Sequence, residues 1–192
     1  MRTPAERAAF EQGLEHIYAP IASDLQCAEE ILHAELRSEV DFVAELTSRV
    51  QRYRGKRLRP ALLLLVGQAA GGIRPDHHTL AAVVEMIHVA TLRHDDVLDG
   101  ADLRKHTPHV NAEWGNEASV LLGDYLFTHS FHLAATLGST LACRVIGRAT
   151  NAVCEGELHQ VARRGAVNMS QIEYLNIIAG KTAELIAVCG WL

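Results

Sequence analysis

Residues 81–103 constrain the fold most strongly, because apolar side chains cover almost every side of the helix that they predict. One polar stripe interrupts this surface, with spacings of three, seven, four and three residues; it consists of Glu85, His88, Asp95, Asp99 and Asp102. Such a stripe is either the solvated face of a surface helix or the lining of a polar cavity inside a helical bundle. The apolar positions wrap most of the way round the helix, so the pattern favours the cavity.

Two carboxylates of the stripe indicate the ligand that the cavity would take. Asp95 and Asp99 are four residues apart, which places them about 40° apart around the helix axis, so both can reach one partner. Like charges this close repel unless something neutralises them. Paired carboxylates suit Mg²⁺, which keeps several waters and completes its shell with substrate phosphates. Asp95 and Asp99 are therefore the predicted metal ligands.

The rest of the chain also has helical periodicity, so the predicted fold class is all-α. Gly71–Gly72 is expected to end one helix, and Ser170 to begin another with Glu173 at the capping-box position. Asn116 is the expected cap of a helix that follows a turn at residues 107–108. The expected helices span residues 4–18, 21–36, 40–50, 58–70, 76–103, 117–137, 140–163 and 171–192.

Length, charge and cysteine content limit the class of protein. The 192 residues suit a single domain, residues 1–192, and the net charge of −5 argues against nucleic acid as the main partner. The longest apolar run, residues 61–66, is too short for a transmembrane segment. The four cysteines lack metal-site spacing, so we expect reduced thiols in a cytoplasmic protein.

A basic run precedes the helix expected at residues 58–70. It holds five cations within residues 52–59, and Arg104 and Lys105 add two more directly after the acidic stripe. Taken alone, such a run is most often a solvated loop, but cations at a helix start face an unfavourable dipole unless an anion sits there. Carboxylates for Mg²⁺ beside cations for phosphate predict a site that handles a diphosphate.

Six motifs, in order along the chain, resemble those of the trans-isoprenyl (polyprenyl) diphosphate synthases. They are GKRLRP at 55–60, DDVLD at 95–99, DLRK at 102–105, the segment 115–127, GELHQ at 156–160 and GKTA at 180–183. The resemblance implies an isoprenoid-synthase helical bundle around a central cavity and a Mg²⁺-dependent prenyltransferase. Such an enzyme condenses isopentenyl diphosphate with an allylic prenyl diphosphate. The resemblance also implies a homodimer or a heteromer.

Position by position, the resemblance implies roles for individual residues. The catalytic residues would be Asp95, Asp96, Asp99, Arg104 and Lys181. Asp95 and Asp99 would hold Mg²⁺, and Asp96 would support the shell of the metal. The allylic diphosphate would be bound by Arg104, Lys181 and Thr182. Isopentenyl diphosphate would be bound by Lys56, Arg59, His88 and Lys105.

Product length is also implied by the resemblance. In the family, bulky residues four and five positions before the first aspartate close the floor of the product pocket. Thr91 and Ala90 occupy those positions here, and both are small. The resemblance therefore implies a long all-trans product, beyond farnesyl.

The sequence departs from the family pattern in three places. The family usually has Arg-Arg-Gly after Asp-Leu and Pro-Thr just beyond, where residues 105–109 here read Lys-His-Thr-Pro-His. Arg93 stands where an apolar residue is usual. The second aspartate-rich motif, which binds further Mg²⁺ in the family, is missing from these 192 residues. We therefore expect a truncated bundle with little or no activity by itself and with an exposed core that drives association.

Three other functions remain open at this point. A non-catalytic subunit or fragment of a two-chain synthase would keep the same fold. An HD-type metal phosphohydrolase would use His94–Asp95 with His77, His78 or His88, yet it needs none of the basic, DLRK or GKTA motifs. A class I terpene cyclase shares DDxxD but has no use for an isopentenyl site in the basic run.

Overall fold

The computed structural model describes residues 4–52, 55–100, 103–104 and 107–192, which are almost entirely helical. The helical elements are α1 (Pro4–Tyr18), the 3₁₀ turn η1 (Ala19–Ile21), α2 (Ala22–Glu35), α3 (Asp41–Arg52), α4 (Leu58–Ala69), α5 (Pro75–Leu98), α6 (Val110–Thr136), α7 (Thr140–Ala162), α8 (Gln171–Ile178), the π turn η2 (Ala179–Ala183) and α9 (Glu184–Trp191). Two short strands, β1 (Leu103–Arg104) and β2 (Thr107–Pro108), pair antiparallel. The predicted all-α fold class is confirmed.

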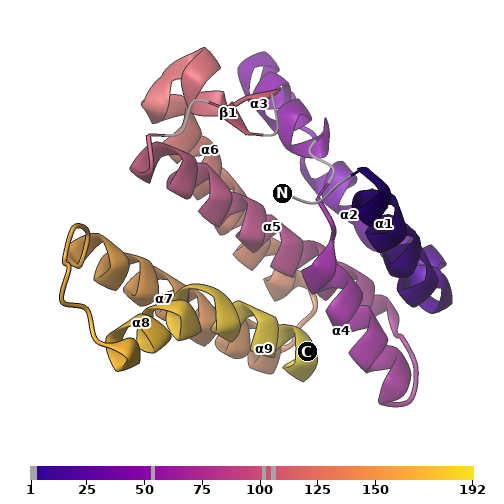
Figure 1. The fold of residues 1–192 in the computed structure, drawn as a ribbon. Helices are drawn as coiled ribbons and strands as arrows, with labels where there is room; N and C mark the ends of the chain where they lie inside the picture. The colour runs from indigo at the N-terminus through magenta and orange to yellow at the C-terminus, as the bar shows by residue number, and fades with distance from the viewer. Residues whose placement is uncertain (1–3, 53–54, 101–102, 105–106) are drawn as a thin grey trace.

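Helix α5 is the central element of the molecule. It contacts α2, α4, α6 and α9, and Figure 1 shows α5 and α6 running between α1–α3 on one side and α7–α9 on the other. Nearly every residue of α5 between Leu80 and Ala90 is buried, so all sides of this part of the helix are covered. This burial agrees with the apolar surface that the sequence predicted there.

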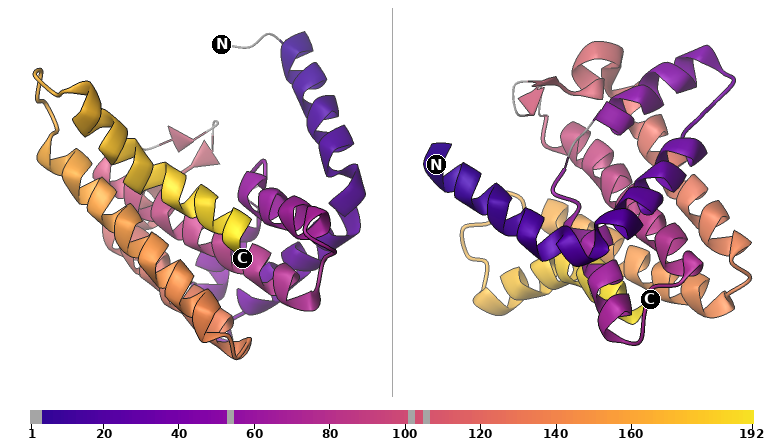
Figure 2. Two further views of the ribbon diagram at one scale, coloured as in Figure 1. Left: turned by 90° about the horizontal axis from the view of Figure 1, so that it is seen from below. Right: turned by 90° about the vertical axis from the view of Figure 1, so that its right-hand side faces the viewer.

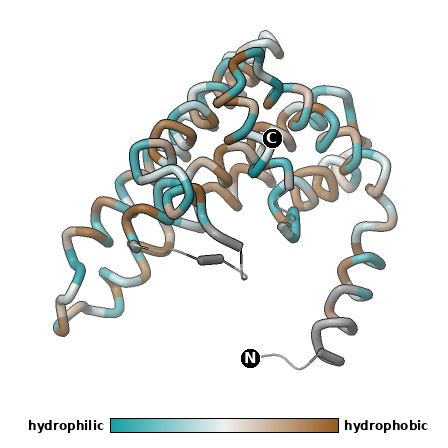
Figure 3. The backbone as a smooth tube through the Cα atoms, turned by 90° about the horizontal axis from the view of Figure 1, so that it is seen from above, coloured by the Kyte–Doolittle hydropathy of each residue, from teal (hydrophilic) through white to brown (hydrophobic). Residues whose placement is uncertain are grey.

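A second layer lies along α5 and consists of α7 with the segment α8–η2–α9. These two rods run side by side in Figure 2, and the contacts between α7, η2 and α9 agree with that view. The N-terminal helix α1 extends away from this body (Figure 2). Apolar and polar residues are interleaved along the helices (Figure 3), as amphipathic packing requires. Within the described ranges, the longest helices are still too polar to be membrane-spanning candidates.

Two helix boundaries that the sequence predicted are confirmed in detail. After α4, Gly71 and Gly72 adopt positive φ angles of 125° and 120°, and the Gly72 N–H donates to the Gly67 carbonyl at 3.0 Å. This is the Schellman arrangement, which satisfies a carbonyl at the end of the helix. At the start of α8, the Ser170 hydroxyl accepts from the Glu173 N–H, and the Glu173 carboxylate accepts from the Ser170 N–H. The capping box is therefore present.

Three other boundaries differ from the prediction. Helix α5 ends at Leu98 rather than at residue 103, because Gly100 adopts a positive φ of 58° just beyond its cap. Helix α6 begins at Val110 rather than at residue 117, and non-helical angles at Gly115 (φ 84°, ψ 165°) kink it between the two parts. The expected helix from residue 171 onward contains the π turn at residues 179–183. All three depend on single glycines or on packing rather than on hydrophobic periodicity.

Candidate active site

The C-terminal turn of α5 carries both predicted metal ligands. The Asp99 N–H donates to the Asp95 carbonyl at 2.9 Å, so the turn stays helical up to its cap and the two side chains remain on one side of the axis. Asp95 is the more enclosed of the two, with 24% of its side chain exposed against 57% for Asp99. Asp99 contacts Arg164, whose guanidinium lies 3.4 Å from the carboxylate and also donates to the Leu98 carbonyl at 3.1 Å.

Lys181 of η2 faces Asp95 across the gap between the two layers. Its Nζ lies 2.6 Å from the Glu157 carboxylate of α7 and 3.6 Å from that of Asp95. Burial lowers the pKa of Lys181, but the hydrogen bond to Glu157 and the charge of Asp95 outweigh that effect and leave the pKa above its ordinary value. Lys181 is therefore a firmly charged cation between two carboxylates.

Two glycines explain how Lys181 reaches this position. A Cβ on Gly156 would lie 2.5 Å from the backbone nitrogen of Lys181, and a Cβ on Gly180 would lie 2.8 Å from the Ala152 carbonyl. The backbones of α7 and η2 thus touch without side chains between them. The π turn at the same point widens the helix locally, a feature that is frequent at functional sites. The close approach of the two backbones and the π turn together direct Lys181 toward Asp95.

A pocket of about 650 Å³ lies between α5, α6, α7 and η2, with Asp95, Glu157 and Lys181 in its wall. His94 and Asp124 add polar groups, and the His94 Nε2 lies 3.1 Å from the Asp124 carboxylate. Apolar residues make up most of the remaining lining: Val97, Leu98, Val120, Phe127, Val153, Leu158 and Val161. The pocket therefore combines a charged group of residues with an apolar wall.

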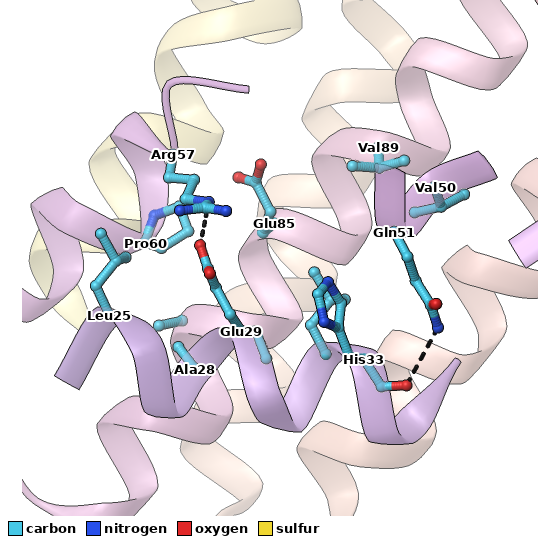
Figure 4. A pocket seen from close by; sticks show the side chains of 13 residues that line it. Leu25, Ala28, Glu29, His33, Val50, Gln51, Arg57, Pro60, Glu85 and Val89 are labelled. Carbon is cyan, nitrogen blue, oxygen red and sulfur yellow. Dashed lines mark hydrogen bonds and ion pairs between the residues drawn. The ribbon is translucent and has the colours of Figure 1, made fainter. Parts of the chain in front are cut away.

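The basic run forms a cluster beside Glu85, near the middle of α5. Arg57 starts α4 in the left-handed region, at φ 52° and ψ 35°, and pairs with Glu29 of α2 (Figure 4). Glu85 of α5 lies nearby; burial raises its pKa, against the opposing charges of Arg59 and Arg57. Lys56 is exposed, and its Nζ lies 4.4 Å from the centre of the Phe10 ring.

Along α5, the basic cluster lies beside Glu85, on the N-terminal side of Asp95. Neither Lys56 nor Arg59 lines the pocket of Asp95. Glu85, which interacts with Arg59, precedes Asp95 by ten residues, and this separation corresponds to about 15 Å along a helix. The side chains of Arg104 and Lys105 lie outside the described residues.

The remaining predicted residues have varied environments. Thr91 lines the pocket, whereas its neighbour Ala90 is completely buried in the core. His88 is half-buried on α5, and Thr182 is exposed on η2. Asp96 does not line the pocket; only 4% of it is exposed, and it contacts Arg93 and His109 instead.

Sequence reasoning missed two members of the site. Glu157 belongs to the GELHQ motif, which by itself assigns it no role, and Arg164 lies in none of the six motifs. Glu157 also accepts a hydrogen bond from the Gln160 side chain at 3.2 Å, so the two polar residues of that motif are linked. Their spacing of three residues on a helix is a sequence signal from which this link could have been predicted.

The residues present fit a Mg²⁺ ion that takes most of its ligands from elsewhere. Burial raises the pKa of Asp95, Lys181 opposes the rise, and the charges of Glu157 and Asp99 add to it. An additional cation would relieve this excess of negative charge. The described residues contain no cluster of three or more side chains that would enclose a metal by themselves. Two carboxylates one turn apart match an ion that completes its shell with water and phosphate oxygens.

Comparison with known proteins agrees with this arrangement. A profile of the polyprenyl synthetase family matches residues 40–190. Octaprenyl diphosphate synthase of Escherichia coli is 36% identical over 172 residues, which are 90% of this chain and 53% of that protein. Heptaprenyl diphosphate synthase component 2 of Geobacillus stearothermophilus is 35% identical over 174 residues, 91% of this chain and 54% of its own length.

A solved structure shows the same fold. The crystal structure of a decaprenyl diphosphate synthase from Rhodobacter capsulatus superimposes with a TM-score of 0.88 and 35% identity, covering 92% of this chain and 55% of that one. The chain thus spans about half the length of the relatives that it matches. Because the family profile extends over most of its residues, the chain belongs to the polyprenyl synthetase family.

Proposed function

We propose that this chain carries the allylic-diphosphate half of a long-chain trans-prenyltransferase. The observation that most supports the proposal is the juxtaposition of Asp95 and Lys181 in an otherwise largely apolar pocket. A prenyl diphosphate has the matching polarity, since a charged diphosphate is joined to a hydrocarbon tail. The names of the relatives, which are octaprenyl, heptaprenyl and decaprenyl diphosphate synthases, support a long product.

The proposed reaction assigns a task to each part of the pocket. The bond between C1 of the allylic chain and the diphosphate oxygen breaks, and its electron pair leaves with the diphosphate. The double bond of isopentenyl diphosphate then bonds to C1, and loss of a proton completes the longer chain. Lys181 stabilises the negative charge that grows on the leaving group. Mg²⁺, when held by Asp95 and Asp99, supplies further positive charge there.

The apolar wall of the pocket excludes water. An allylic cation in contact with water would be captured as an alcohol, so the pocket must stay dry during the reaction. Phe127, Val153 and Leu158 contribute apolar surface along the path that a growing tail would follow from Asp95. Thr91 lies on the same wall and leaves room there because it is small.

We assign isopentenyl diphosphate to the basic cluster, with Lys56, Arg59 and His88 as its ligands. Two observations support this assignment: Lys56 is exposed, and among the described residues the buried Nε of Arg59 has no hydrogen-bond partner. The side chains of Arg104 and Lys105 lie outside the described residues, and their assignment to the two diphosphates rests on the sequence motif alone.

We further propose that turnover needs a second aspartate-rich motif from outside these residues. The sequence holds one DDxxD, at residues 95–99, and the chain spans about half of its relatives. One relative is named as a component of heptaprenyl diphosphate synthase, which favours an assembly with a second chain. Such an assembly would complete the metal cluster on the opposite wall of the pocket.

A binding assay combined with a turnover assay tests this function. Isothermal titration of the chain with inorganic diphosphate in Mg²⁺ is expected to show saturable binding. The double variant Asp95→Asn/Asp99→Asn should weaken that binding by at least about tenfold, because it removes both metal ligands. With farnesyl diphosphate, radiolabelled isopentenyl diphosphate and Mg²⁺, the chain alone should give little or no product.

The outcomes separate the two parts of the proposal. Diphosphate binding that the double variant leaves unchanged would contradict the site. Rapid turnover by the chain alone would contradict the need for a second motif but would support the chemistry. Adding a partner chain that bears another DDxxD should raise turnover, and only in the protein with intact Asp95 and Asp99.

The geometry gives less support to an HD-type phosphohydrolase. That chemistry needs histidines that converge on one metal together with Asp95. His78 instead pairs with Asp24 at 2.7 Å, His77 accepts from the Arg74 N–H at 3.0 Å, and His94 lies beside Asp124. These rings have separate partners in different parts of the molecule.

A further inference from the structure

Two departures from the family pattern meet at one buried carboxylate. Arg93 stands where the family usually has an apolar residue, and His109 stands where the family usually has a threonine after proline. The Arg93 guanidinium lies 3.3 Å from Asp96 Oδ2, and the Nδ1 atom of His109 lies 2.6 Å from the same oxygen. All three residues are more than nine-tenths buried. A carboxylate at this depth is disfavoured without a polar partner, and Arg93 and His109 place two nitrogen atoms beside it.

Backbone contacts of the same three-residue cluster join α5 to α6. The Ser119 hydroxyl, fully buried, donates to the Arg93 carbonyl at 3.1 Å. The Asn111 side chain approaches the Asp96 carbonyl at 3.5 Å. Asn111 precedes the kink at Gly115 and Ser119 follows it, so both parts of α6 contact the end of α5. These contacts therefore oppose rotation of the end of α5 about its axis.

The geometry of the helix connects this cluster to the candidate metal ligands. Around the axis of α5, Asp95 lies about 100° and Asp99 about 60° from Asp96, both on the same side of it. Anchoring Asp96 thus fixes the rotation of the turn that carries the other two carboxylates. The end of α5 also carries three aspartates within five residues, at the negative end of the helix dipole and with no basic residue in its last turn. The Arg93 guanidinium brings a positive charge to this end of the helix.

We infer that Arg93 and His109 are positioning residues that act through Asp96 to hold Asp95 and Asp99 in the orientation that binds the metal. The inference rests on the proposed function, because it assigns Mg²⁺ to Asp95 and Asp99. Neither Arg93 nor His109 lines the pocket that holds Asp95. Their effect is to fix the turn that carries the ligands, as outer-shell partners do in metal sites.

Metal affinity and thermal stability, measured on the same variants, test the inference. Mn²⁺ binding to the full chain in the presence of inorganic diphosphate is followed by the electron paramagnetic resonance signal of free Mn²⁺. Arg93→Met keeps the length of the side chain but removes its charge, and it should weaken Mn²⁺ binding by about tenfold. Arg93→Lys should restore part of that loss. Arg144→Met, at an exposed position on α7, is the matched control and should leave the affinity unchanged.

A double-mutant cycle with Asp96 distinguishes positioning from general damage. If Arg93 acts through Asp96, Asp96→Asn and the double variant Arg93→Met/Asp96→Asn should bind Mn²⁺ equally well. His109→Asn keeps a donor near the Nδ1 position and should bind more tightly than His109→Leu. The His109 pair also provides the test if Arg93→Met does not fold.

Three results would overturn the inference, and each has a different meaning. Lower melting temperatures with unchanged Mn²⁺ affinity would show that the cluster is only structural. A loss of affinity for Arg93→Met that persists in full on the Asp96→Asn background would show that Arg93 does not act through Asp96. Mn²⁺ binding by the unmutated chain that is insensitive to Asp95→Asn and Asp99→Asn would refute the proposed function, and the inference with it.

Discussion

At the scale of single residues, adjacent positions on α5 have opposite environments. Ala90 is completely buried in the hydrophobic core, whereas Thr91 lines the pocket and donates its hydroxyl to the His88 carbonyl at 2.8 Å. The two positions are about 100° apart around the axis, so one turn of helix carries both a packing residue and a pocket residue. The family resemblance assigns both Ala90 and Thr91 to the pocket floor, but in the structure the two residues have different roles.

This contrast gives a prediction for a matched pair of substitutions. Thr91→Phe should leave the fold intact and fill the pocket, so an active synthase that carries this sequence should make a shorter product. Ala90→Phe forces a ring into a packed core and should lower the free energy of unfolding by about 1–3 kcal/mol or more. Chromatography of the products and thermal denaturation of the chain are the measurements. Products of the same chain length from the unmutated protein and from Thr91→Phe would show that Thr91 does not limit the length of the pocket.

At the scale of elements, the contact between α7 and η2 controls the position of Lys181. Gly156 and Gly180 allow the two backbones to touch, and any side chain there would separate them. The contact is tertiary, since residue 156 is 24 positions before residue 180 in the sequence. The GExxQ and GKTA motifs therefore meet as one packed unit.

Substitution of glycines within α7 tests this view. Gly156→Ala should destabilise the chain by about 1–3 kcal/mol and weaken diphosphate binding, because the new Cβ would lie 2.5 Å from the Lys181 nitrogen. Gly147→Ala, in the same helix, meets only the Phe131 ring at 3.8 Å and should be neutral or stabilising by up to about 1 kcal/mol. Chemical denaturation and calorimetry measure the two effects. Similar stabilities for both variants would contradict the close packing.

At the scale of the whole molecule, large apolar side chains remain exposed on the second layer and on α6. On α6 and α7 these include Leu121, with 66% of its surface exposed, and Leu158, with 69%. On the α8–α9 rod they include Ile172 and Trp191, exposed to 72% and 82%. Exposed apolar surface on this scale is typical of proteins that associate.

We therefore expect the chain to self-associate or to bind a partner chain at micromolar concentration. Light scattering after size-exclusion chromatography should give a mass above 21.0 kDa for the unmutated chain. Leu158→Glu combined with Ile172→Glu should shift the mass toward the monomer, whereas Val40→Glu, at an exposed position before α3, should not. A monomer at all concentrations, without and with a partner chain, would argue against this expectation.

Sequence alone determined the features that act within a few residues of each other. It predicted the all-α class, the glycine cap after residue 70, the Ser170–Glu173 box and the placing of Asp95 and Asp99 on one side of a helix, because caps and helical periodicity are local interactions. Tertiary structure decided which distant groups meet. Lys181 reaches Asp95 through the close approach of two glycines, and Asp96 contacts Arg93 and His109. These contacts depend on how deeply and at what rotation the helices pack, which no local pattern specifies.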